Sequence, residues 1–152
     1  MPTLSSEVLE LLTRLCKQAD LASSVMLQPH QKRFVQKVQA LPPNAGILAY
    51  HGLGSGKTLS SIAAAEALGG KKEIVVPAAL RENYRKELNK FVAKPQGYHV
   101  DSYSKAVNEG SLPQADTTVF DEAQRMGRPE SALSNLPAAA SGRKIFLSGT
   151  PI

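Results

Sequence analysis

The sequence lacks the features that mark secreted and membrane-spanning proteins. Its 152 residues include a single cysteine, Cys16, so no disulfide can form within the chain and a reducing compartment is expected. Residues 1–7 lack the basic segment followed by an apolar one that makes a secretory signal. The most apolar helical segment, residues 59–68, is too short to cross a bilayer and contains Glu66. We therefore expect an intracellular protein without a membrane partner; these features do not distinguish cytoplasm, nucleoid and nucleus.

Acidic residues are fewer than basic ones. Lysine and arginine number 18 against 13 aspartates and glutamates, which gives a net charge of +5 and a pI near 9.4. This excess favours a polyanion such as nucleic acid as partner, although it also serves plain solubility. With 42% hydrophobic and 20% charged residues, the chain has the composition and length of one soluble globular domain.

Short apolar runs alternate with helical stretches along most of the chain. A helix is expected over residues 5–18 and another over 29–40, before the pattern of strand and helix begins. Strands are predicted at residues 46–50, 73–77, 98–101, 117–121 and 144–148, with helices at 58–68, 79–91 and 103–108 between them. This alternation predicts an α/β fold with a mostly parallel sheet of at least five strands and helices on both faces.

A phosphate-binding loop follows the first predicted strand, in residues 51–58, HGLGSGKT. Its glycines allow the backbone N–H groups to approach phosphate oxygens, Lys57 can reach the β- and γ-phosphates, and the Thr58 hydroxyl can bind magnesium. The full pattern has glycine where this chain has His51. A nucleotide, ATP or GTP, is the expected ligand. The residues predicted to bind it are Gly52, Gly54, Ser55, Gly56, Lys57 and Thr58.

Two adjacent carboxylates, Asp121 and Glu122, end the fourth predicted strand. In an enzyme with a phosphate-binding loop, Asp121 would hold the magnesium ion, and Glu122 would orient and deprotonate the attacking water. Two solvated acids at a strand end are the alternative. Because parallel strands end at one edge of a sheet, the loops after all five strands are expected to form one composite site.

Residues 121–124, DEAQ, resemble motif II of superfamily-two helicases and translocases. The other segments are similar to further motifs of the Swi/Snf-like group: residues 27–31 to the Q motif, 74–80 to motif Ia, 101–103 to motif Ib and 146–152 to motif III. The resemblance covers residues 25–152, which would form the first RecA-like, ATP-binding lobe, and leaves residues 1–24 as a separate N-terminal helix.

The resemblance implies roles for individual residues. Gln31 would read the adenine of ATP, and Lys57 and Glu122 would be catalytic, with magnesium held by Thr58 and Asp121. Motif III would be coupled to the γ-phosphate through Gln124, Ser148, Gly149 and Thr150, although the group usually has histidine at the position of Gln124. The backbone of duplex DNA, bound without sequence preference, would be contacted by Ala79, Leu80, Arg81, Ser102 and Tyr103.

The family's second RecA-like lobe, in the same chain, supplies arginines that stabilise the transferring phosphoryl group. Residues 1–152 lack that lobe, so we expect them to hydrolyse ATP weakly. The sequence leaves two other functions open, a small P-loop kinase and a non-catalytic nucleotide- or DNA-binding module, and it does not separate DNA from RNA. The three histidines show no metal-ligand spacing, so no zinc site is predicted.

Overall fold

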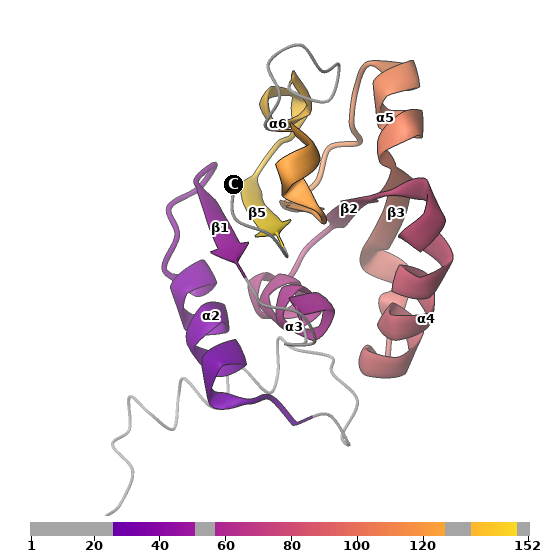
Figure 1. The fold of residues 1–152 in the computed structure, drawn as a ribbon. Helices are drawn as coiled ribbons and strands as arrows, with labels where there is room; N and C mark the ends of the chain where they lie inside the picture. The colour runs from indigo at the N-terminus through magenta and orange to yellow at the C-terminus, as the bar shows by residue number, and fades with distance from the viewer. Residues whose placement is uncertain (1–25, 51–56, 127–134, 149–152) are drawn as a thin grey trace, which may run out of the picture.

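The computed structural model describes residues 26–50, 57–126 and 135–148. The helix predicted for residues 5–18, the loop through Gly56, and the residues Gly149 and Thr150 lie outside the described residues. The helices are α2 (Pro29–Gln39), α3 (Lys57–Leu68), α4 (Arg81–Phe91), α5 (Tyr103–Glu109) and α6 (Leu136–Ala139). The strands are β1 (Gly46–Tyr50), β2 (Lys72–Val76), β3 (Tyr98–Ser102), β4 (Thr117–Phe120) and β5 (Arg143–Ser148). Figure 1 shows their arrangement.

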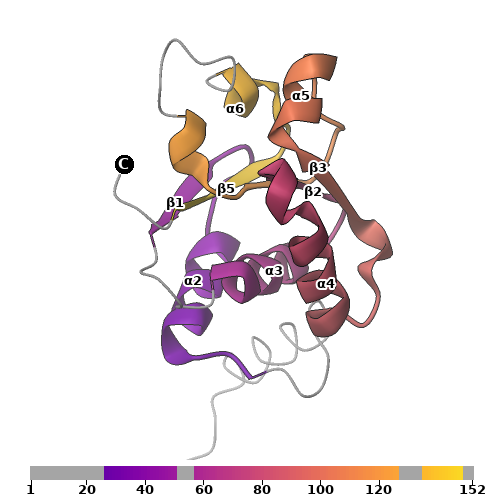
Figure 2. The same cartoon turned by 45° about the vertical axis from the view of Figure 1, so that its right-hand side comes forward.

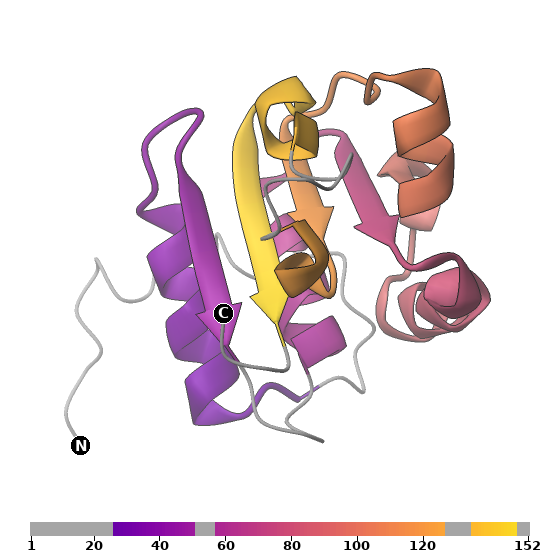
Figure 3. The ribbon, with the colours of Figure 1, turned by 45° about the horizontal axis from the view of Figure 1, so that its top comes forward.

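All five strands are parallel, in the order β1-β5-β4-β2-β3. Figure 3 shows the strands side by side with their arrowheads at one edge. This confirms the predicted α/β fold, and the observed strands begin or end within one residue of the predicted ones. The last strand, β5, inserts between β1 and β4, so three segments far apart in sequence become neighbours.

Helices cover both faces of the sheet, as predicted. Figure 2 shows α2, α3 and α4 on one face and α5 and α6 on the other. The first core includes Val38, Ile62, Ile74, Val119, Ile145 and Leu147. The second core includes Val75, Tyr103, Phe120, Met126 and Leu136, and the rings of Phe120 and Phe146 stack with centroids 5.3 Å apart. Alternate residues of each strand thus enter opposite cores, as the two-residue period of a strand requires.

Local sequence fixes several element boundaries. Pro29 is the first residue of α2, where its missing N–H costs no hydrogen bond, and Gln28 and Gln31 form a reciprocal capping box. Gly142, with φ of 71°, precedes β5; a Cβ atom there would lie 2.2 Å from the carbonyl oxygen of Asp116. Only glycine fits this backbone and this close approach.

The burial of two residues differs from what their residue types suggest. Leu80, an apolar residue at the start of α4, is 39% exposed, whereas Tyr84 and Leu88 of the same helix are buried. Lys72, a charged residue of β2, is buried. Its Nζ lies 3.6 Å from Glu66 Oε1 and over the ring of Tyr98, so the buried charge has a partner. Among the described residues, no helix has the length and apolar character needed to span a membrane.

Candidate functional site

The strand order brings three predicted site segments to one edge of the sheet. Strands β1, β5 and β4 are neighbours, and their carboxyl ends bring Tyr50, Ser148 and the residue after β4, Asp121, to this edge; residues 51–56, which follow Tyr50, lie outside the described residues. Thr58 lies in the first turn of α3, where its carbonyl accepts a hydrogen bond of 2.8 Å from Ser61 Oγ. A helix that starts at this edge directs its positive end toward a bound anion.

Asp121 is held rigidly at the end of β4. Its side chain is buried, with 4% exposure, and its Oδ1 accepts a 3.0 Å hydrogen bond from the Glu122 backbone N–H. Its own N–H donates to the Val75 carbonyl at 2.9 Å, and its carbonyl accepts the Tyr103 hydroxyl at 2.6 Å. The next residue, Glu122, has φ of 53°, a left-handed conformation that is uncommon for a residue other than glycine. The chain therefore turns sharply at the acid pair.

A hydrogen-bonded chain of side chains joins the ends of β4 and β5. The amide Nε2 of Gln124 donates to Glu122 Oε2, and the Ser148 hydroxyl donates to Gln124 Oε1 at 3.0 Å. Glutamine can make both contacts at once because it carries a donor and an acceptor. The structure thus brings together Glu122, Gln124 and Ser148, three residues whose roles in hydrolysis and coupling remain predictions.

Gln31, the predicted adenine-reading residue, is buried in the first turn of α2. Its Oε1 accepts a 2.7 Å hydrogen bond from the backbone N–H of Gln28, which fixes the side chain. Helix α2 packs against α3. The Gln31 side chain is therefore held on the helix that packs against α3, and its nucleotide role remains a prediction.

The predicted nucleic-acid residues divide into two groups. Ala79 and Leu80 are exposed and Arg81 is half-buried at the start of α4, where they could meet a phosphate. Ser102 and Tyr103 are buried. The Ser102 hydroxyl caps α5 by accepting the Lys105 N–H at 3.1 Å. The Tyr103 hydroxyl, which donates to the Asp121 carbonyl, supports the acid motif and is not available to a DNA phosphate in this conformation.

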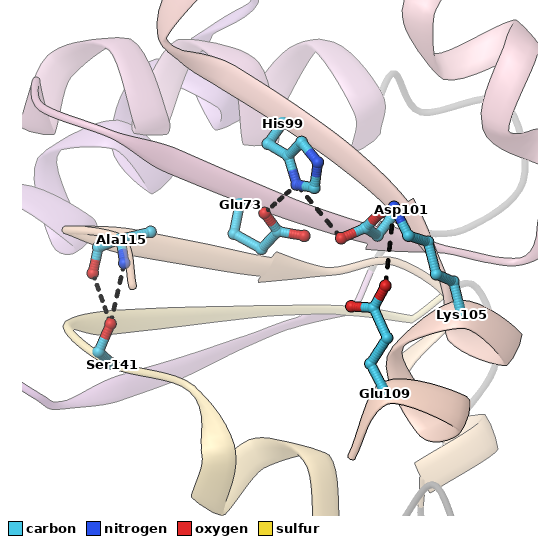
Figure 4. Close-up of polar contacts among 7 residues, drawn as sticks. All are labelled: Glu73, His99, Asp101, Lys105, Glu109, Ala115 and Ser141. Atoms are coloured by element: carbon cyan, nitrogen blue, oxygen red, sulfur yellow. Dashed lines mark hydrogen bonds and ion pairs between the residues drawn. The ribbon is translucent and has the colours of Figure 1, made fainter. Parts of the chain in front are cut away.

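The structure also gathers three ionisable side chains that sequence spacing missed, Glu73, His99 and Asp101, with Lys105 of α5 beside them. His99 Nδ1 lies 2.7 Å from Glu73 Oε2 and 3.2 Å from Asp101 Oδ2, and Lys105 Nζ lies 3.2 Å from Asp101 Oδ1 (Figure 4). Burial, and then the nearby Asp101 carboxyl, raise the pKa of Glu73 to about 9. Burial alone would raise the pKa of Asp101, but neighbouring Glu73, Lys105 and His99 lower it. Only the register of β2 and β3, which sequence spacing does not show, could have revealed this set.

Glu73 should make the unfolding free energy of the domain depend on pH when no metal ion is bound. Its pKa rises from an ordinary 4.5 to about 9 on folding, so folding disfavours the ionised form. The protonated Glu73 side chain therefore contributes to folding stability in full below pH 4.5, and this contribution is lost as the pH rises toward 9. Between these limits, wild type should lose up to about 1.4 kcal/mol of unfolding free energy per pH unit relative to Glu73→Gln.

Denaturant unfolding of both proteins from pH 5 to 9, with a chelator present, measures this difference. The groups that face Glu73 are His99, Asp101, Lys105 and Glu109, and both proteins retain them. Parallel curves for the two proteins would show that Glu73 titrates normally.

Comparison with known proteins shows what this chain is similar to in sequence and in structure. No protein-family model matches the sequence. Over 79 residues the chain is 37% identical to a protein of Acanthamoeba polyphaga mimivirus that is named as an ATP-dependent RNA helicase; the match covers 51% of this chain and 14% of the viral protein. The structure is similar to the Sulfolobus solfataricus SWI2/SNF2 ATPase core, which was solved in complex with double-stranded DNA. That match has a TM-score of 0.64 and 22% identity.

The structural match covers 88% of this chain and 34% of the Sulfolobus protein. The chain therefore spans about one third of the solved protein and one seventh of the viral relative. The sequence match to one protein and the structural match to the other agree with the family that the motifs resemble. The described part of the chain has the RecA-like fold of the SWI2/SNF2 ATPase core, and its resemblance to superfamily-two helicases and translocases is confirmed.

Proposed function

We propose that this chain is the ATP-binding lobe of an intracellular, DNA-dependent ATPase of the helicase or translocase type. The observation that carries the proposal is the hydrogen-bonded chain from Glu122 through Gln124 to Ser148, at the same sheet edge as the start of α3. These hydrogen bonds can connect Glu122, the residue expected beside the attacking water, to Ser148 at the end of the neighbouring strand. Structural acids on a solvated surface have no need of this link.

The proposed roles follow from position. ATP would bind with its phosphates against residues 52–58, and the magnesium ion would be held by Thr58 and Asp121. The Asp121 carboxylate suits this role because burial and its backbone hydrogen bond fix its orientation. Glu122 would act as general base toward water, oriented by the Gln124 amide. A second RecA-like lobe would supply arginine side chains to the γ-phosphate.

Duplex DNA is the proposed polymer partner. The Sulfolobus structure contains double-stranded DNA, and the net charge of +5 favours a polyanion. The half-buried Arg81 at the start of α4 and the exposed residues before it are available for contacts with the DNA backbone. Contacts of this kind recognise phosphate rather than base edges, so binding should be indifferent to sequence.

Salt titrations test the DNA contact. Binding of residues 1–152 to a labelled duplex should be weak, independent of base sequence and steeply reduced by salt, because each phosphate contact releases counterions. Arg81→Ala should lower the slope of log affinity against log salt by about one unit. Arg85→Ala, one turn along α4 where the side chain pairs with Glu82 at 3.2 Å, is the matched control.

Fluorescence anisotropy at several salt concentrations gives both slopes. An identical titration with duplex RNA determines whether DNA is preferred. Sequence-selective binding that persists at high salt would contradict a phosphate-tracking lobe, and equal slopes for wild type and Arg81→Ala would remove Arg81 from the interface.

A further inference from the structure

A cluster of metal-type ligands lies on the sheet face that α5 and α6 cover, at the side of β3. Glu73 of β2 and His99 of β3 are register partners, and Asp101 follows two residues later on β3. Residues two apart on a strand share a face, so these three side chains meet. Parallel pairing of two strands, rather than spacing along one segment, brings them together.

The ligand atoms are already close to one another. One nitrogen of His99 and one carboxylate oxygen each of Glu73 and Asp101 all lie within 4.8 Å of one another. Glu73 is 1% exposed, and its Oε1 has no hydrogen-bond partner among the described residues. In Figure 4 this oxygen points toward Asp101. A bare carboxylate oxygen inside a protein is costly, so this oxygen needs either a proton shared with the Asp101 carboxyl or a cation bound between the two carboxyls.

We propose that Glu73, His99 and Asp101 bind one divalent transition-metal cation of the zinc class. One imidazole nitrogen and two carboxylate oxygens form a three-ligand set that zinc accepts in tetrahedral geometry, with water as a fourth ligand. The imidazole disfavours magnesium, which prefers an all-oxygen octahedral shell. This site is separate from the magnesium site proposed at Thr58 and Asp121 and takes a different ion.

The surroundings of the cluster suit a bound cation. The half-exposed His99 provides access from solvent. Lys105 contacts Asp101 Oδ1, whereas His99 contacts Oδ2, so the lysine can orient the carboxylate while the other oxygen binds the ion. Glu109 Oε1 in turn lies 4.0 Å from Lys105 Nζ, and a dashed line in Figure 4 marks this ion pair.

The position of the site indicates what the cation would do. It would join β2 to β3 immediately before α5, whose first residue is Tyr103. The Tyr103 hydroxyl donates to the Asp121 carbonyl. A cation here would therefore stabilise the β3–α5 junction that supports the acid motif, without contacting ATP.

Zinc binding to the chelator-treated 152-residue protein tests the proposal. In calorimetric titrations with zinc chloride, wild type should bind one ion at this site and gain thermal stability, whereas magnesium at equal concentration should not reproduce the gain. His99→Gln and Asp101→Asn should weaken this binding by about 100-fold or more, because loss of a direct ligand costs at least as much as loss of an outer partner. Glu109→Gln is the matched control, because Glu109 pairs with Lys105 and is not one of the three proposed ligands.

Two further variants separate this site from other zinc ligands. Cys16→Ser and Glu122→Gln should each retain the His99-dependent ion, because neither residue belongs to the cluster. His99→Gln changes a half-exposed side chain and should unfold cooperatively, as thermal melting would verify. Zinc binding that is unchanged in both His99→Gln and Asp101→Asn, or absent from wild type, would overturn the proposal. A proton, and not a cation, would then lie between the carboxyls of Glu73 and Asp101. ATP binding is not used as a readout, so failure here is distinguishable from failure of the proposed ATPase function.

Discussion

Replacement of Glu122 with glutamine is expected to lower ATP hydrolysis by about 10²- to 10⁴-fold, the usual contribution of a general base. The affinity for MgATP should stay nearly unchanged, because the amide keeps the size of the side chain and the phosphate-binding residues are untouched. The Gln124 amide can still contact the new side chain through its remaining oxygen. Single-turnover hydrolysis at saturating ATP measures the effect on the chemical step.

Glu82→Gln is the matched control for this experiment. Glu82 is an exposed acid on α4 that pairs with Arg85, and its loss should leave the hydrolysis rate at the wild-type value. If Glu122→Gln hydrolyses ATP as fast as wild type, the acid pair is a solvated strand end and the catalytic assignment is wrong.

Addition of a second RecA-like lobe should cause a large increase in the rate of ATP hydrolysis. Arginine residues supplied to the γ-phosphate contribute about three to five orders of magnitude in rate. Residues 1–152 alone should therefore hydrolyse ATP slowly and respond little to DNA, since the cleft that closes around the nucleotide needs both lobes. A longer chain that continues into a second lobe should recover DNA-stimulated hydrolysis in a steady-state phosphate-release assay.

If residues 1–152 alone hydrolyse ATP rapidly, the dependence of the rate on protein concentration shows where the catalytic arginine lies. If residues 1–152 alone turn over ATP at roughly 1–10³ per second, the rate typical of enzymes, a catalytic arginine is already present. A rate per molecule that falls on dilution would place that arginine on a second copy. A rate that stays high would place it within these residues and contradict the proposed division between two lobes.

Much of this fold follows from patterns within the sequence. Alternation of apolar runs with helical stretches predicted every strand of the parallel sheet to within one residue. The loop glycines and Lys57 predicted a nucleotide site at a strand-to-helix junction, and α3 begins at Lys57. These features are local, because hydrophobic period and turn-forming residues act over one element at a time.

Features that depend on contacts between distant segments could not be predicted in the same way. Composition gives no sign that β5 inserts between β1 and β4. Tyr103 was expected to contact DNA, but in the packed structure its hydroxyl donates to the Asp121 carbonyl. Lys72 is buried because Glu66 of another element neutralises it. Glu73 and His99 meet only through strand register. In each case a partner from another element overrides what the residue type suggests in isolation.

Calorimetric titration of MgATP into wild type and Lys57→Ala tests whether this lobe binds ATP through residues 51–58. Lys57 is the only fixed positive charge in residues 51–58, and its loss should remove most of the affinity for the phosphates. Lys71→Ala, an exposed lysine at the opposite edge of the sheet, is the matched control and should bind as wild type does. One ATP should bind per wild-type chain, and Lys57→Ala alone should show a marked loss of affinity. Equal ATP affinity in wild type and Lys57→Ala would show that residues 51–58 do not form the ATP site.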